Sequence, residues 1–87
     1  MIKILVVDDE KPICDCIDRN LSASGYQCRT VQDGLEALNI IESEPFDLIL
    51  LDIMLPGADG YDIMEYIRPM GIPVIFITAK HEVRDRV

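Results

Sequence analysis

Three aspartates in this sequence directly follow apolar runs. Asp8 and Asp9 come after "KILVV", and Asp52 comes after "LILL" at 48–51. A carboxylate is costly to desolvate without a compensating partner, so acids at the ends of apolar runs need a reason. Clustered carboxylates repel one another, and a hard cation such as Mg²⁺, which prefers oxygen ligands, would neutralise them. These residues therefore predict a magnesium site.

A single aspartate at the end of a strand has an ordinary explanation, because Asp favours turns and helix caps. Here two apolar runs end in acids, and Thr78 ends a third run. Threonine alone would carry no weight, since it is common in strands. The coincidence of three such run ends favours a shared site over three unrelated turns.

The elements that would position these acids are short runs with apolar residues at consecutive positions, at 2–7, 48–51 and 73–77. This pattern is typical of strands buried on both faces in a parallel sheet covered by helices. Segment 26–31 has a weaker strand pattern and is predicted nearer an edge. Because parallel strands bind ligands at their carboxyl ends, the acids converge if the strands at 2–7 and 48–51 are neighbours.

Helical patterns separate these strands, which predicts an α/β fold with alternating strands and helices. The first helix, over 11–24, has Pro12 in its first turn and Gly25 at its end. The second begins with a capping box formed by Asp33 and Glu36.

A third helix is predicted to be capped by Asp59 and to stop before Pro69. A fourth is expected to begin within "AKHEVRDRV" at 79–87. The apolar faces of the first three helices are predicted to be formed by Ile13, Cys16, Ile17 and Leu21, by Leu35, Leu38 and Ile41, and by Ile63, Met64 and Ile67. Six other acids are expected to be solvated: Asp15, Asp18, Glu42, Glu44, Asp62 and Glu65.

Length and composition exclude several classes of protein. The chain has 87 residues, enough for one domain, and a net charge of −8, which argues against direct contact of this segment with nucleic acid. Its apolar runs are strand-sized and no secretion signal opens it, so we expect no membrane span and a cytoplasmic location. Cys14, Cys16 and Cys28 lack metal-ligand spacing and are predicted to be reduced thiols, with Cys14 and Cys16 on different helix faces.

The same stretches resemble the receiver domain of two-component response regulators. The similar motifs are "ILVVDDE" (4–10), "DLILLDIMLPGADG" (47–60) and "PVIFITAK" (73–80), in order and at the family's spacing. The resemblance covers essentially all 87 residues, and "DIMLPG" with "TAK" looks most like the subfamily that has a winged-helix DNA-binding effector domain. It implies a flavodoxin-like, or CheY-like, doubly wound parallel sheet.

The resemblance also implies roles for individual residues. Asp52 matches the aspartate that receives a phosphoryl group from a sensor histidine kinase. Asp9 matches a direct Mg²⁺ ligand, and Asp8 its neighbour, which acts directly or through water. Met54 matches the position whose backbone carbonyl completes the metal site, and Thr78 matches the hydroxyl that bonds the phosphoryl oxygens.

The chain departs from the family at its end. Relative to the family's strand order 2-1-3-4-5, we expect order 2-1-3-4, with the fifth strand, its lysine and the last helix missing. Residues 1–87 are therefore expected to be a receiver domain truncated at its C-terminus. The strand at 73–77 would then be an apolar edge, which predicts homodimers through that edge or through 79–87.

Three functions remain open from the sequence. The first is a phosphoacceptor domain in a two-component regulatory system, which regulates transcription through an output domain and catalyses only its own phosphorylation and dephosphorylation. The second is a phosphatase with an aspartyl nucleophile. That class would have a general acid two residues after the nucleophile, where this chain has Met54, so we expect no enzyme of this kind. The third is an interaction module that is never phosphorylated.

Overall fold

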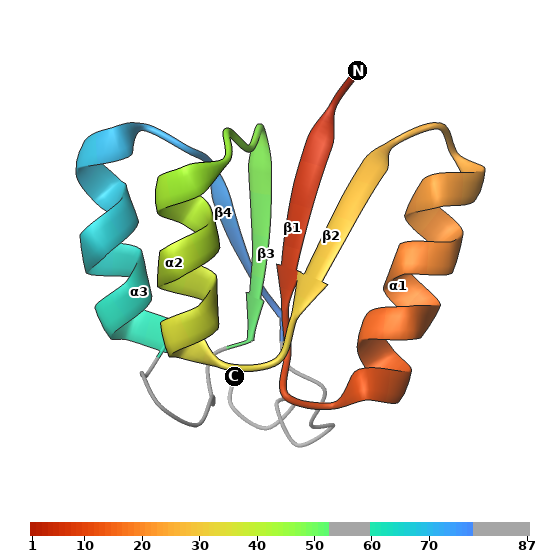
Figure 1. Ribbon diagram of the computed structural model, residues 1–87, viewed down its shortest axis with the longest axis horizontal. Helices are drawn as coiled ribbons and strands as arrows, with labels where there is room; N and C mark the ends of the chain where they lie inside the picture. Colours follow the sequence, from red (N-terminus) through yellow and green to blue (C-terminus); the bar gives the residue numbers. More distant parts are fainter. Residues whose placement is uncertain (53–59, 78–87) are drawn as a thin grey trace, which may run out of the picture.

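The computed structural model describes residues 1–52 and 60–77 of the chain. Strands and helices alternate along these residues, as the sequence pattern predicts (Figure 1). The elements are β1 (Lys3–Val7), α1 (Lys11–Ala23), β2 (Gln27–Val31), α2 (Gly34–Ser43), β3 (Leu48–Asp52), α3 (Gly60–Ile67), the 3₁₀ turn η1 (Arg68–Met70) and β4 (Val74–Ile77). No helix within these described residues is long and apolar enough to cross a membrane.

The four strands form one parallel sheet in the order β2-β1-β3-β4. The predicted strand order and α/β class are therefore confirmed, and β2 lies at an edge as expected. Ile4 is in register with Cys28 of β2 and with Leu48 of β3, so β1 is the centre of the pairing. Since β1 and β3 are neighbours, the residues that follow them emerge side by side.

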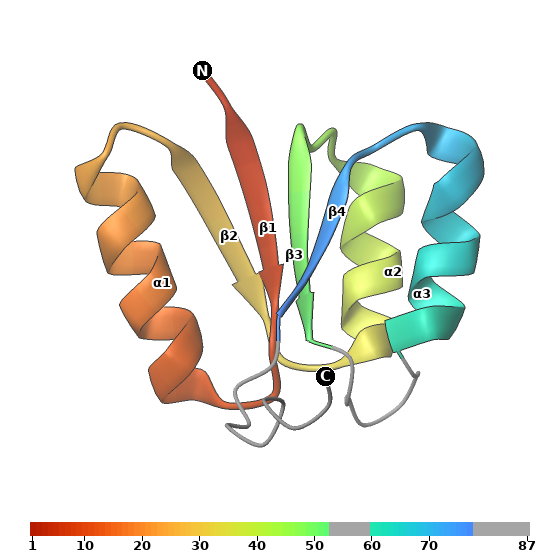
Figure 2. The ribbon, with the colours of Figure 1, turned by 180° about the vertical axis from the view of Figure 1, so that it is seen from behind.

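Helices cover both faces of the sheet. One face carries α1 and the other carries α2 and α3, as the two opposite views show (Figures 1 and 2). Along β1 the buried side chains alternate between the two faces: Leu5 and Val7 belong to the core beneath α2 and α3, whereas Ile4 and Val6 pack near α1. Because β1 is buried on both faces, its sequence is apolar at consecutive positions and does not alternate with polar residues.

Two helix ends follow directly from local sequence. The carboxylate of Asp33 accepts a hydrogen bond of 2.8 Å from the backbone N–H of Glu36, so the predicted start of α2 is confirmed. After α1, Gly25 has a φ of 96°, a conformation that favours glycine and ends the helix. The α3 helix stops at Ile67, before Pro69 as predicted, and the 3₁₀ turn continues through the proline.

Two predicted apolar faces were partly wrong. In α1 the buried cysteine is Cys14, and Cys16 is exposed, because the side of α1 that meets the sheet passes through Cys14 and Ile17. The expectation that these two cysteines lie on different faces is nevertheless confirmed. In α2, Leu35 is 60% exposed, and Ala37 takes its place in the core with other residues of α2. A helix with several apolar residues does not reveal from its sequence which of them face the sheet.

The last described strand, β4, is less buried than its apolar sequence predicts. Ile75 is 52% exposed and Phe76 is 36% exposed. Among the described strands β4 lies at the edge of the sheet, next to β3. The predicted pairing of copies through this edge stays a prediction. The predicted helix within 79–87 and the predicted cap at Asp59 lie outside the described residues.

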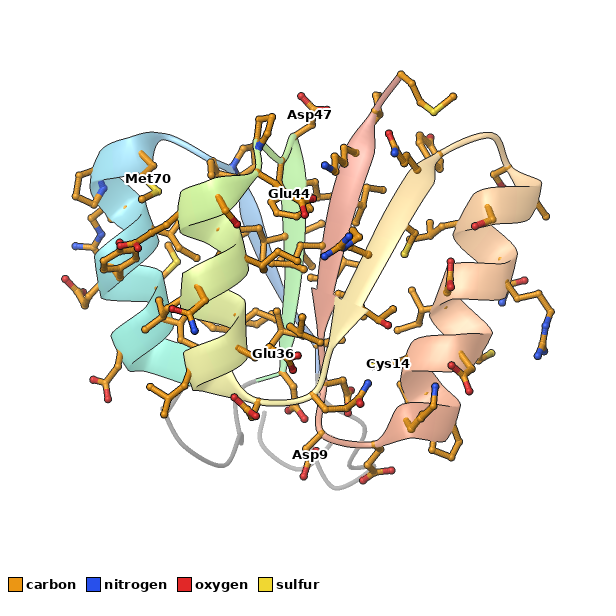
Figure 3. All side chains as sticks on the ribbon, in the orientation of Figure 1. Asp9, Cys14, Glu36, Glu44, Asp47 and Met70 are labelled. Atoms are coloured by element: carbon orange, nitrogen blue, oxygen red, sulfur yellow. The ribbon has the colours of Figure 1, made fainter. Side chains whose placement is uncertain are left out.

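At the opposite end of the sheet from Asp9, a group of charges joins β1, β2 and the end of α2 (Figure 3). The Lys3 Nζ atom lies 2.6 Å from Glu44 Oε1, and an Arg29 guanidinium nitrogen lies 3.2 Å from Glu44 Oε2. The backbone N–H of Lys3 also donates to the Asp47 carboxylate at 2.8 Å. Glu44, which was predicted to be solvated, is thus an ion-pair partner, and its pKa is lowered chiefly by the hydrogen bond from Lys3.

Candidate functional site: an acidic cluster at the strand ends

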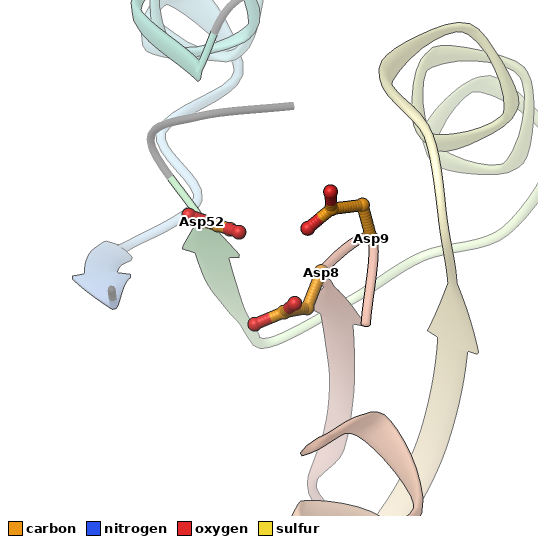
Figure 4. A group of neighbouring side chains, drawn as sticks. All are labelled: Asp8, Asp9 and Asp52. Carbon is orange, nitrogen blue, oxygen red and sulfur yellow. The ribbon is translucent and has the colours of Figure 1, made fainter. Parts of the chain in front are cut away.

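Asp8, Asp9 and Asp52 lie together at the carboxyl end of the sheet. One carboxylate oxygen from each residue lies within 4.8 Å of those from the other two. Asp52 ends β3, whereas Asp8 and Asp9 are in the chain that leaves β1, so the three side chains surround one space (Figure 4). The convergence predicted from parallel strand ends is confirmed.

The three acids differ in exposure. Asp8 is 0% exposed and Asp52 is 1% exposed, whereas Asp9 is exposed to solvent. The cluster therefore combines two buried carboxylates with a third that is exposed to solvent. Buried charges of the same sign are unfavourable unless a cation or hydrogen bonds compensate them.

Backbone hydrogen bonds fix Asp8 within this cluster. Its Oδ1 atom accepts a bond of 2.9 Å from the backbone N–H of Glu10. Its own backbone N–H donates to the carbonyl oxygen of Val31, at the end of β2, over 3.1 Å. The position of the Asp8 carboxylate is therefore set by both the following turn and the neighbouring strand.

A thiol lies beneath this turn. Cys14 in the first turns of α1 is 0% exposed, and its Sγ atom lies 3.3 Å from the carbonyl oxygen of Asp8. Burial raises the pKa of the Cys14 thiol above its ordinary value of 9.0, so the group is a neutral S–H donor. Helical spacing placed Cys16, not Cys14, on the predicted apolar face, and no spacing rule would have connected Cys14 to Asp8.

The oxygen chemistry of the cluster fits a hard divalent cation. Such ions bind carboxylate and carbonyl oxygens and retain several waters, and the exposed Asp9 suits an ion that stays partly hydrated. Asp8, Asp9 and Asp52 are the described residues that would hold the ion. Met54 and Thr78, the other two residues predicted for the site, lie outside the described residues, so their roles stay predictions.

A comparison with protein families gives a match for this chain. The response regulator receiver domain family matches the chain over residues 4–87. The chain belongs to that family. The resemblance of the motifs at the three strand ends is thus confirmed, and the acidic cluster lies at the carboxyl ends of the receiver-domain strands.

Solved structures of other receiver domains are similar to this one over nearly its whole length. The receiver domain of Francisella response regulator 1452 is 31% identical, with a TM-score of 0.86, and the match covers 99% of this chain and 73% of that one. The N-terminal domain of a response regulator receiver protein from Methanoculleus marisnigri is 40% identical, with a TM-score of 0.82, and the match covers 90% of this chain and 67% of that one.

One similar receiver domain was solved with a metal ion. The response regulator TrrA from Thermotoga maritima, in complex with Mg²⁺-BeF, is 35% identical to this chain, with a TM-score of 0.80. The match covers 99% of this chain and 77% of TrrA. The likeness thus extends to a receiver domain that binds Mg²⁺ together with a fluoride complex of beryllium.

Proposed function

We propose that this receiver domain accepts a phosphoryl group on Asp52 from a sensor histidine kinase, with Mg²⁺ as cofactor. The observation that carries the proposal is the position of Asp52, a buried carboxylate at the end of β3 beside Asp8 and Asp9. A nucleophile and a place for positive charge are the two things that phosphoryl transfer needs from a protein. The Mg²⁺-BeF complex of TrrA supports the choice of ion.

The transfer itself is a displacement at phosphorus. A carboxylate oxygen of Asp52 attacks the phosphorus atom in line with the bond to the leaving group, and a new O–P bond forms. The bond from phosphorus to the donor breaks, and its electron pair stays with the donor. Bound Mg²⁺ would supply neutralisation of the charge on the phosphoryl oxygens, and Asp8 and Asp9 would hold it there.

The remaining parts of the proposal concern what the phosphorylated domain does. The domain switches an output domain, and the motif resemblance favours a winged-helix domain that binds DNA and regulates transcription. We propose that the protein acts in the cytoplasm and catalyses only its own phosphorylation and dephosphorylation. In this proposal residues 1–87 are the receiver part, and Thr78 bonds the phosphoryl oxygens.

The test is labelling with acetyl phosphate and Mg²⁺, followed by intact-mass measurement. The chain is expected to gain one phosphoryl group as an acyl phosphate that hydroxylamine removes. Asp52→Asn should abolish the gain, while Asp62→Asn, a matched change at an exposed position on α3, should leave it intact.

Two outcomes would contradict the assignment. Labelling of Asp52→Asn at the level of the unsubstituted chain would place the nucleophile elsewhere. A chain that binds Mg²⁺ but gains no mass from either acetyl phosphate or a phosphorylated kinase would favour the alternative function, an interaction module that is never phosphorylated.

A further inference from the structure

Among the residues that the structure describes, the thiol of Cys14 is a buried polar group near the acidic cluster to which the proposed phosphoryl transfer gives no role. It lies between α1 and the sheet, at the same end of the molecule as Asp9 (Figure 3). Its side chain is fully buried, in a small apolar cluster that includes Ile4 and Val6. A residue that only filled this space would need no hydrogen-bonding atom.

The thiol contacts the ends of two strands. Cys14 Sγ lies 3.3 Å from the carbonyl oxygen of Asp8 and 3.9 Å from the carbonyl oxygen of Val31. The same Val31 oxygen accepts the backbone N–H of Asp8 over 3.1 Å. The shorter sulfur contact therefore ties α1 to the point where the chain leaves β1, and the longer one reaches β2.

The segment held in this way carries the acids. Asp8 is fixed at its N–H and its carbonyl, and its Oδ1 atom accepts the N–H of Glu10. The carbonyl of Glu10 in turn accepts the backbone N–H groups of Ile13 and Cys14, over 3.0 and 3.1 Å. Both neighbours of Asp9 are thus fixed to α1, and Asp9 itself projects into solvent between them.

We propose that Cys14 is a positioning residue for the metal site: its S–H bond to Asp8 holds the Asp8–Glu10 turn, and with it the Asp9 carboxylate, in the geometry that Mg²⁺ binding needs. This inference rests on the proposed function, because it concerns the same metal. Residues that orient metal ligands without touching the ion are known to change its affinity. A thiol is suited to the place, since it is a small apolar group that still donates a weak hydrogen bond.

Packing alone is the competing explanation, and two substitutions at the same β-carbon separate it from positioning. Cys14→Ala removes both the sulfur volume and the donor, whereas Cys14→Ser removes the sulfur volume but keeps a donor. Ile17→Val, in the same apolar cluster one helical turn away, is the control for a small loss of core packing without loss of a hydrogen bond.

The experiment uses NMR on the 87-residue chain and these three variants. Without metal, the exchange rates of the Asp9 and Glu10 amide protons are compared with those of β3. Titration with MgCl₂ at constant ionic strength then gives the affinity from amide shifts near the cluster. We expect Cys14→Ala to speed exchange in the turn and to weaken Mg²⁺ binding about fivefold, with Cys14→Ser within about twofold of the unsubstituted chain.

The outcomes are distinguishable. If Cys14→Ala and Cys14→Ser weaken Mg²⁺ binding equally, or if Ile17→Val weakens it as much, the thiol only fills space and the inference is wrong. Unchanged affinity in all three variants would overturn the inference and leave the proposed function intact. Failure of the unsubstituted chain to bind Mg²⁺ at all would overturn the metal site and the inference together.

Discussion

We expect that removing one negative charge from the acidic cluster stabilises the metal-free protein, because the carboxylates repel one another. Asp52→Asn is the sharpest case, because Asp52 is 1% exposed and its carboxylate lies within 4.8 Å of those of Asp8 and Asp9. Two unit charges 4.8 Å apart repel by about 3.5 kcal/mol at an effective dielectric constant of about 20, and by about 0.9 kcal/mol in bulk water.

These two repulsion energies set the range for the change in the free energy of unfolding. The repulsion between the two buried carboxylates lies near the upper value, and the repulsion from exposed Asp9 lies near the lower one. Part of the gain is offset, because an asparagine side chain cannot accept as many hydrogen bonds as a carboxylate. We therefore expect the free energy of unfolding of Asp52→Asn, measured without metal, to exceed that of the unsubstituted chain by about 2 kcal/mol.

Mg²⁺ should reduce this difference. The ion stabilises only a folded chain that binds it, by about 1.4 kcal/mol when its free concentration is ten times the dissociation constant. The unsubstituted chain gains that stability, and Asp52→Asn gains little of it. The assay is urea unfolding followed by far-UV circular dichroism near neutral pH, in EDTA and in MgCl₂ at matched ionic strength.

Asp15→Asn is the control for the loss of one negative charge. Asp15 is on α1, its side chain is 49% exposed, and it pairs with Lys11 across 3.1 Å. Exposed pairs of this kind contribute less than about 1 kcal/mol, so the control should be nearly neutral and should keep its response to Mg²⁺. The reasoning is refuted if Asp52→Asn is no more stable than the unsubstituted chain in EDTA, or if Mg²⁺ stabilises both equally.

Three further predictions concern other parts of the structure. Asp9→Asn should weaken Mg²⁺ binding, measured by calorimetric titration, far more than Asp15→Asn, and equal affinities would contradict the assignment of Asp9. Asp33→Ala removes the cap of α2 and should lower the free energy of unfolding by about 1 kcal/mol without changing Mg²⁺ affinity. Lys3→Met removes the main cause of the lowered Glu44 pKa, whose ordinary value is 4.5. A carboxyl group whose pKa is lowered by folding stabilises the protein at pH values above its ordinary pKa, and this stabilisation is lost as the pH falls through the folded-state pKa. The destabilisation by Lys3→Met should therefore be full near neutral pH and shrink below about pH 4. A destabilisation that does not change with pH would show that Lys3 acts through its cation–π contact with the ring of Phe46, over which its Nζ atom lies.

Patterns in the sequence were enough to predict the fold and to single out the acids. The runs at 4–7 and 48–51 are apolar at every position, a pattern typical of strands that are buried on both faces in a parallel sheet between helices. The cap of α2 by Asp33 and the end of α1 at Gly25 could also be predicted. Both depend only on residues a few positions apart in the sequence. The acids at the ends of these runs then had to meet once the strands were paired.

The side chains that support those acids could not be predicted, because they depend on how the helices pack against the sheet. Helical spacing in the sequence favoured Cys16 as the core cysteine of α1, but the packing of the helix on the sheet buried Cys14 instead and brought its sulfur to Asp8. In the same way, Glu44 was predicted to be solvated at a helix end, but in the folded chain it forms ion pairs with Lys3 and Arg29. Helices and strands can be predicted from local sequence patterns because residues close together in the sequence determine them. The contacts of Cys14 and Glu44, in contrast, form only when the helices and strands pack together.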